Sequence, residues 1–144
     1  MRFKPQHQHS STPNADFLRN YARIMFRDAR SEQPSKALPI ARRIHAAGIL
    51  PFQRLTDLYR HRESLQLKHL LRTIAVELGF PTWDACKRNV DSLPTTVLDR
   101  FRLDLGGFND YEQIWFPSQS AAQEWQREQG GRIVAYGNQA VILQ

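Results

Sequence analysis

The sequence predicts an α+β protein in which a bundle of about five helices precedes a small strand–helix–hairpin unit that packs on it. Two observations support this prediction. Apolar residues recur at helical spacing, with short links between the runs, up to residue 92. Beyond that point, alternating and aromatic runs separated by turn residues are typical of strands. We therefore expect a disordered tail over residues 1–13, a basic helical domain over 14–92 and a small α/β unit with three or four strands over 93–144.

The clearest helical pattern lies between Ser64 and Val90. Apolar side chains recur at i, i+3, i+4, i+7, i+8 and i+11, which predicts one buried stripe formed by Leu67, Leu70, Leu71, Ile74, Ala75 and Leu78. Ser64 is the expected N-cap, and Gly79 is expected to end this helix in the left-handed conformation. Thr82 is then the expected N-cap of a second helix, and Trp83 is expected to lie in the core.

Earlier helices are expected on either side of proline-containing links. Asn14 or Asp16 is expected to open the first helix, because both side chains accept hydrogen bonds from free backbone amides. After a connector, Pro39 fits the first turn of a short helix whose C-terminal cap is Gly48. Pro51 is expected to start the next helix in the same way.

The last fifty or so residues show a different pattern. Apolar and charged side chains alternate over residues 101–105, which predicts a strand, and the aromatic run over 111–116 predicts another. A helix capped by Ser118 or Ser120 is expected to end before Gly130. Strands are then expected over residues 132–136 and 139–143, because the Gly-Asn pair between them is a hairpin signal.

Charge is distributed unevenly along the chain. Residues 1–90 hold 16 Lys and Arg against 7 Asp and Glu, a net charge of +9, and residues 91–144 hold 4 against 7, a net charge of −3. A basic half joined to a mildly acidic half indicates an anionic partner for the first half, either DNA or RNA or an acidic protein. A surface made soluble by arginines is the alternative interpretation of the same pattern.

Basic side chains recur on the expected outer faces of the helices. On the first helix, arginines at spacings of four, four and three form a stripe, although like charges four residues apart destabilise a helix slightly. Such a stripe is a candidate for phosphate contacts. The candidate nucleic-acid-binding residues are Arg19, Arg23, Arg27, Arg30, Arg42, Arg43, Arg60, Arg62, Lys68, Arg72, Lys87 and Arg88.

The expected helix pair around Gly79 partly resembles a helix-turn-helix. The resemblance rests on Ala75 and Gly79, which are four residues apart, and on the apolar residues around them. It implies that the helix from Thr82 enters the major groove, with Asp84 and the basic residues after it in contact with bases or phosphates. The pattern departs from the family at Ala85 and Arg88, where branched apolar residues are usual, so an angled helix pair that only packs a core is the alternative.

The string LRTIAVELGFPTWDACKR resembles a short helical module of bacterial proteins of uncharacterised function. The module consists of an apolar helix, then Gly-Phe or Gly-Tyr, then a small polar residue and Trp. Some proteins of this kind carry a glyoxalase-like domain beside the module, but the C-terminal unit here is too short for one. The resemblance implies the module and no activity, with Trp83 and Phe80 as its core anchors.

Signals for catalysis are weak, and we expect a protein that is not an enzyme and needs no cofactor or metal. The histidines at positions 7, 9, 45, 61 and 69 show no spacing typical of metal ligands. Cys86 lies on an apolar helical stripe, where a buried inert thiol is common. A nucleophilic Cys86 near a helix start stays open as the alternative.

A cytoplasmic location without a membrane segment is expected. No apolar run approaches the length of a membrane span, and the first 14 residues lack the apolar core of a secretory signal. Two functions are consistent with these observations. One is a small nucleic-acid-binding protein, and the other is a protein–protein interaction or regulatory module that docks an acidic protein or pairs its sheet edge with a partner strand.

Overall fold

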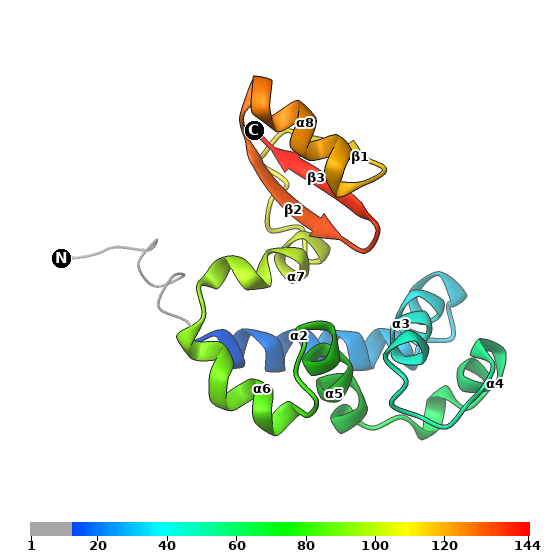
Figure 1. The fold of residues 1–144 in the computed structure, drawn as a ribbon. Helices are drawn as coiled ribbons and strands as arrows, with labels where there is room; N and C mark the ends of the chain where they lie inside the picture. Colours follow the sequence, from blue (N-terminus) through cyan, green and yellow to red (C-terminus); the bar gives the residue numbers. More distant parts are fainter. Residues whose placement is uncertain (1–12) are drawn as a thin grey trace. The chain divides into compact units, whose positions relative to one another are not determined.

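A computed structural model describes residues 13–144. Helices come first and a three-stranded antiparallel sheet follows, which confirms the expected α+β class (Figure 1). The chain divides into two compact units, the first ending at Leu93 and the second running from Pro94 to Gln144. The predicted tail lies outside the described residues, except for Pro13. No helix among residues 13–144 is long and apolar enough to cross a membrane.

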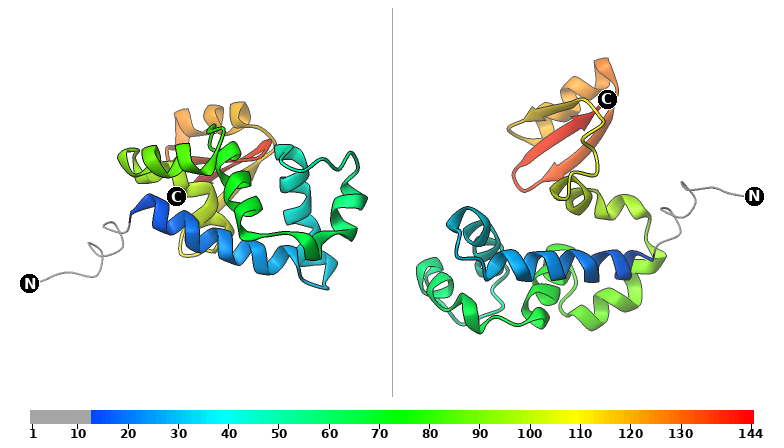
Figure 2. Two further views of the ribbon diagram at one scale, coloured as in Figure 1. Left: turned by 90° about the horizontal axis from the view of Figure 1, so that it is seen from below. Right: turned by 180° about the vertical axis from the view of Figure 1, so that it is seen from behind.

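The first unit contains five α-helices within the described part of the chain. These helices are α2 (Asn14–Ala29), α3 (Pro34–Ala47), α4 (Leu55–Arg60), α5 (Leu67–Glu77) and α6 (Trp83–Asn89). Single 3₁₀ turns, η1 (Arg62–Ser64) and η2 (Val90–Ser92), follow α4 and α6. The longest helix, α2, packs against α3 and α5, as both views of Figure 2 show.

The core of the first unit lies between α2, α3 and α5. Each of these helices is amphipathic, and its apolar stripe faces the other two because that arrangement removes the most apolar surface from water. Completely buried side chains include Leu18, Met25, Ile44, Leu70 and Ile74. The predicted apolar stripe of α5 is therefore confirmed at Leu70, Ile74 and Ala75.

The start of α2 is tied to the end of the same unit. The buried Asn14 side chain donates hydrogen bonds to the carbonyl oxygens of Val90 (2.8 Å) and Leu93 (3.1 Å). The Asp91 carboxylate accepts a hydrogen bond from the Ala15 amide at 2.8 Å. A carboxylate at this position stabilises the positive end of the helix dipole, so Asp91 caps α2 from a segment 76 residues away.

The predicted start of the second helix is wrong. Helix α3 begins at Pro34 and holds Pro39 in its interior, whereas a connector had been expected before Pro39. Proline at the first helical position loses no hydrogen bond, which favours Pro34 there. An interior proline removes one backbone bond, but Ala37, Ala41 and Ile44 share one buried face across it, and this burial maintains the helix. The predicted Gly48 cap is confirmed, with φ of 69°.

Two other predicted helix starts are also wrong. Pro51 lies outside α4, which begins at Leu55, and Ser64 lies in η1, before α5. The N-cap of α5 is Gln66, whose amide donates to Nδ1 of His69 at 2.9 Å. Burial and the nearby Lys68 charge lower the pKa of His69, which favours the neutral ring that this acceptor nitrogen requires.

The turn after α5 confirms the sequence prediction. Gly79 has φ of 92°, its amide bonds to the Val76 carbonyl at 3.0 Å, and the Phe80 amide bonds to the Ala75 carbonyl at 2.8 Å. These bonds form a Schellman motif. The Thr82 hydroxyl then accepts from the Ala85 amide at 3.1 Å and caps α6, also as predicted.

Replacing Gly79 by valine is expected to lower the free energy of unfolding by more than about 1 kcal/mol, because a β-branched residue resists positive φ. A Cβ at this position would meet no atom within 4 Å, so backbone strain alone should cause the loss. Asparagine tolerates the left-handed region, so Gly79→Asn should lose less. Urea denaturation of the three proteins measures the difference, and equal stability of all three would contradict the left-handed turn.

The second unit contains two α-helices and one sheet. Its elements are η3 (Thr95–Leu98), α7 (Asp99–Asp104), β1 (Gln113–Phe116), α8 (Gln119–Gln129), β2 (Arg132–Tyr136) and β3 (Gln139–Leu143). The strand order is β1-β3-β2, with both pairs antiparallel, so β2 and β1 form the two edges. The predicted hairpin and the Ser118 cap of α8 are confirmed.

The strand predicted over residues 101–105 is wrong, because this segment forms α7. Alternation suggested a strand, but only Phe101 is fully buried, whereas Leu103 is half-buried and Leu105 is exposed. A segment this short fits either period, and the 3₁₀ turn directly before it continues into a helix. The sheet therefore has three strands in the described residues.

The sheet is covered on both faces. On one face, Ala140 and Ile142 pack under Ala122 of α8, with Phe116 and Trp125 beside them. On the other face, Phe108 packs on Val134, Val141 and Leu143. Because β3 is buried on both faces, its sequence is nearly continuous in apolar residues, as expected for a central strand.

Candidate nucleic-acid interface

The predicted arginine stripe forms one exposed face of α2. Its four arginines follow one another at spacings of four, four and three residues; they are Arg19, Arg23, Arg27 and Arg30. Because successive helical residues are about 100° apart, the four side chains fall within an arc of about 80°. This arc lies opposite the buried stripe that contains Leu18, Ala22 and Met25. The stripe therefore presents its guanidinium groups to solvent.

The hydrogen bonds and ion pairs of the stripe that are found within residues 13–144 are local. Arg19 pairs with Asp16 at 2.6 Å, and Arg27 approaches Asp28 at 3.4 Å with 74% of its side chain exposed. Arg23 donates to the Asn20 amide oxygen at 3.0 Å. Exposed pairs of this kind contribute about 0–1 kcal/mol. A phosphate can therefore displace the carboxylates at little cost.

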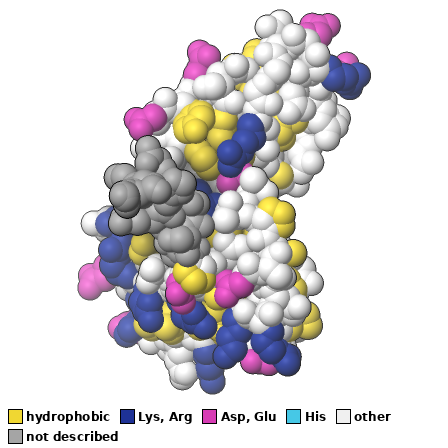
Figure 3. All heavy atoms as spheres, turned by 90° about the vertical axis from the view of Figure 1, so that its left-hand side faces the viewer, with side chains coloured by type: hydrophobic (Ala, Val, Ile, Leu, Met, Phe, Trp, Pro, Cys, Tyr) yellow, Lys and Arg dark blue, Asp and Glu magenta, His cyan; other side chains and the backbone are white. Residues whose placement is uncertain are grey.

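Helix α6 extends the basic surface beside the stripe. The Arg19 guanidinium lies 5.8 Å from the centroid of the Trp83 ring, which joins the two helices. Trp83 is half-buried, so its expected place in the core is only partly correct, and the arginine covers part of its ring. Lys87 and Arg88 lie further along α6, both exposed and both near Asp84, at 3.8 Å and 2.9 Å. Figure 3 shows basic side chains over the helical unit with acidic ones among them.

Arg43 has a structural role. Its guanidinium donates to both carboxylate oxygens of Glu77, at 2.9 Å and 2.7 Å, and to the Tyr21 hydroxyl at 2.6 Å. Burial lowers the pKa of Arg43, but the hydrogen bonds and negative charge of Glu77 outweigh burial and raise it above its ordinary value. The side chain links α3 to α2 and α5, so we leave it out of the interface.

Arg62 is held in a similar way. Its guanidinium lies 4.3 Å from the Tyr59 ring centroid and donates to the carbonyl oxygens of Ser31 and Tyr59, both at 3.1 Å. These bonds connect the loop before α3 to the end of α4. The sequence suggested phosphate contact because arginine spacing does not distinguish a side chain that satisfies backbone carbonyls from one that faces solvent.

Four other predicted residues are exposed cations on the remaining helices. No hydrogen bond or ion pair of their side chains is found between residues 13 and 144. They are Arg42 of α3, Arg60 of α4, and Lys68 and Arg72 of α5. Because α3 and α5 both pack against α2, these cations add to the positive potential of the unit. They fall on several helices, whereas the stripe lies on one.

A short turn at Gly79 joins α5 to α6, but α6 is poorly suited to reading bases. Helix α6 has only 7 residues. Its exposed side includes Asp84, whose carboxylate would face the phosphates. Thr82 is occupied as the cap of α6. The arrangement favours contacts of arginines with the phosphate backbone of a nucleic acid over recognition of its bases in a groove.

Groups suited to catalysis are scarce in the described part of the chain. Burial raises the pKa of the Cys86 thiol to about 11, which leaves it protonated near neutral pH, as an inert core thiol requires. No group of three His, Cys, Asp or Glu residues that could hold a metal is found between residues 13 and 144. His7 and His9 lie outside the described residues.

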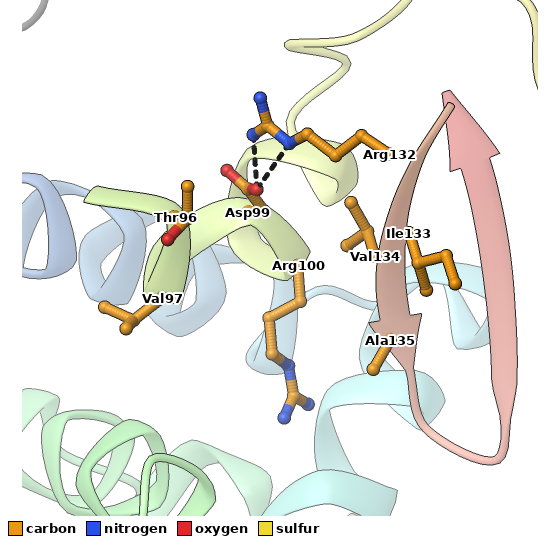
Figure 4. A pocket seen from close by; sticks show the side chains of 8 residues that line it. All are labelled: Thr96, Val97, Asp99, Arg100, Arg132, Ile133, Val134 and Ala135. Carbon is orange, nitrogen blue, oxygen red and sulfur yellow. Dashed lines mark hydrogen bonds and ion pairs between the residues drawn. The ribbon is translucent and has the colours of Figure 1, made fainter. Parts of the chain in front are cut away.

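The second unit contains a cleft that the sequence did not reveal. Its volume is about 450 Å³, and it lies between η3–α7 and strand β2 (Figure 4). One wall is formed by Thr96, Val97, Asp99 and Arg100, and the other by four consecutive residues, 132–135. Asp99 is 6% exposed and accepts hydrogen bonds from Nε of Arg132, at 3.1 Å, and from its Nη2. Only tertiary contact brings these two segments together.

Comparisons of the chain with protein-family models, with curated proteins and with solved structures found no match. The resemblances to the helical module and to the helix-turn-helix therefore stay predictions.

Proposed function

We propose that the protein binds nucleic acid through phosphate contacts from the basic face of its helical unit. The observation that supports this proposal is the arginine stripe of α2, with four guanidinium groups on one solvent-facing arc. A planar guanidinium donates two parallel hydrogen bonds to a phosphate, which suits arginine to this role. Lys87 and Arg88 of α6 extend the face beside Arg19.

Binding of this kind is independent of base sequence. Phosphate neutralisation releases counterions, so the affinity should fall steeply and linearly on a logarithmic scale of salt concentration. The acidic residues beside the stripe are exposed and weakly paired, so they reduce the potential without blocking access.

Replacing Arg23, Arg27 and Arg30 together by glutamine is expected to weaken duplex binding and to reduce the magnitude of the salt slope by up to about 2.7, at about 0.9 for each lost phosphate contact. The helix should stay folded, because glutamine is a good helix former. Fluorescence anisotropy with two duplexes of unrelated sequence, over a salt series, measures the slope. Both duplexes should weaken by similar factors.

A matched control removes the same charge elsewhere. Lys36, Arg54 and Arg127 are exposed and lie outside α2, so their triple replacement by glutamine should change the slope much less. Equal effects of the two triple variants would show that only net charge matters. No binding of wild-type protein to DNA or RNA at low salt would refute the proposed function and leave the interaction module as the function to pursue.

A further inference from the structure

We propose that the cleft beside β2 binds an extended acidic peptide, which adds to the sheet as a fourth strand. The inference does not depend on nucleic-acid binding by the helical unit. It rests on three features of the second unit, which are the open edge of β2, the wall that faces this edge and the charge of the cleft.

The cleft meets β2 along its edge. Residues 132–135 all line it, although alternate side chains of a strand point to opposite faces of the sheet. Ile133 and Ala135 belong to the α8 face, and Arg132 and Val134 belong to the other face. A cavity that contacts both sets touches the strand from the side, where backbone groups are accessible.

The register shows which backbone groups face the cleft. Hydrogen-bonded and non-hydrogen-bonded pairs alternate in an antiparallel ladder, and the two-residue turn closes on a bonded pair, Tyr136 and Gln139. Val134 is then bonded to Val141, and the amides and carbonyls of Ile133 and Ala135 point away from β3. No other hydrogen bond of these two residues is found within residues 13–144. They offer two donors and two acceptors to an added strand.

The charge of the cleft indicates the chemistry of the occupant. From Pro94 onwards the chain has 4 Arg against 6 Asp and Glu, yet Arg100 and Arg132 line the cleft and Arg102 lies 3.6 Å from Asp99. Arg102 and Arg132 pair with Asp99, and Arg100 lines the same cleft, so three of the four basic residues of an acidic unit lie in or beside it. The local excess of positive charge favours a peptide with an Asp or Glu side chain near Arg100.

The opposite wall favours a single strand over a second copy of the chain as the occupant. Thr96 and Val97 of η3 lie across the cleft from β2, and the ion pair between Asp99 and Arg132 crosses from one wall to the other (Figure 4). A second copy would bring its own η3–α7 segment against this wall if it paired edge to edge. A peptide of four or five residues needs only the width of one strand.

Hydrogen exchange on the free protein gives the first test. The amides of Ile133 and Ala135 should exchange rapidly, and the amide of Val134, which is bonded to β3, should be protected. Protection of Ile133 and Ala135 as strong as that of Val134 would overturn the proposal, because their amides would already be occupied.

The second test selects ligands from a phage-displayed library of random decapeptides on the full-length protein. Enriched peptides should contain at least one Asp or Glu, and fluorescence anisotropy with the synthetic peptides gives their affinity. Replacing that acidic residue by its amide, or methylating alternate backbone nitrogens of the peptide, should each weaken binding at least tenfold. No enrichment, or enriched peptides without acidic residues, would overturn the proposal.

Variants of the protein locate the site. Ala135→Pro removes an outward-facing amide at a sheet edge, where proline is tolerated, and should abolish binding. Arg100→Gln should weaken binding, whereas Arg127→Gln on α8 is the matched control and should not. If Ala135→Pro fails to fold, Arg100→Gln and the methylated peptide still test whether the peptide binds at the edge of β2. Binding that is unaffected by both would place the peptide elsewhere.

Discussion

Replacing Glu77 by alanine is expected to lower the free energy of unfolding by roughly 3 kcal/mol, because removal of one partner of a buried ion pair leaves the other charge uncompensated. Arg43 has 20% and Glu77 13% of its side chain exposed, so water replaces little of the lost interaction. The guanidinium would keep only the Tyr21 hydroxyl among the bonds described above. Urea denaturation followed by circular dichroism measures the loss.

A double variant separates the uncompensated charge from lost packing. Arg43→Met with Glu77→Leu removes both charges and keeps apolar bulk, so it should recover most of the stability that Glu77→Ala loses. Equal losses for the single and double variants would show that packing by the two side chains, not an unpaired charge, is responsible.

Replacing Ile74 by alanine is expected to lower the free energy of unfolding by about 2–5 kcal/mol, because it leaves a cavity in a close-packed core. Ile74 is completely buried on α5, the helix that packs against both α2 and α3. Thermal and urea unfolding of the variant measure the loss.

The matched control lies on the same helix. Val76 is half-buried, so Val76→Ala should lose clearly less than Ile74→Ala. A similar small loss for both variants would contradict the placement of Ile74 at the centre of the helical core.

The elements that could be predicted from sequence are those with local signals. Gly79 and Thr82 were identified correctly because a left-handed cap and a hydroxyl cap each depend on one residue and its nearest neighbours along the chain. The hairpin was identified for the same reason, since Gly137 and Asn138 specify a two-residue turn. The error at Pro39 arose because the burial of one helix face outweighed a local preference, and the error over residues 101–105 arose because so short a segment fits either period.

In the candidate sites, too, only the features with local signals could be predicted. The stripe of α2 could be predicted because helical spacing alone decides that four arginines share a face opposite the core. The structural roles of Arg43 and Arg62 could not be predicted, because their partners Glu77 and Ser31 are 34 and 31 residues away. The cleft beside β2 was missed because α7 was expected to be a strand.

The sequence by itself determined that helices precede a small strand unit, and it determined the caps at Gly79 and Thr82, the hairpin and the exposed arginine stripe. Each of these depends on the conformation of a few consecutive residues or on a single helical period. Tertiary structure decided which basic side chains are held in structural hydrogen bonds and ion pairs, and how deeply Trp83 is buried. It also decided which edge of the sheet lies open beside Arg100 and Arg132. These features depend on contacts between residues far apart in the chain, and no local pattern specifies such contacts.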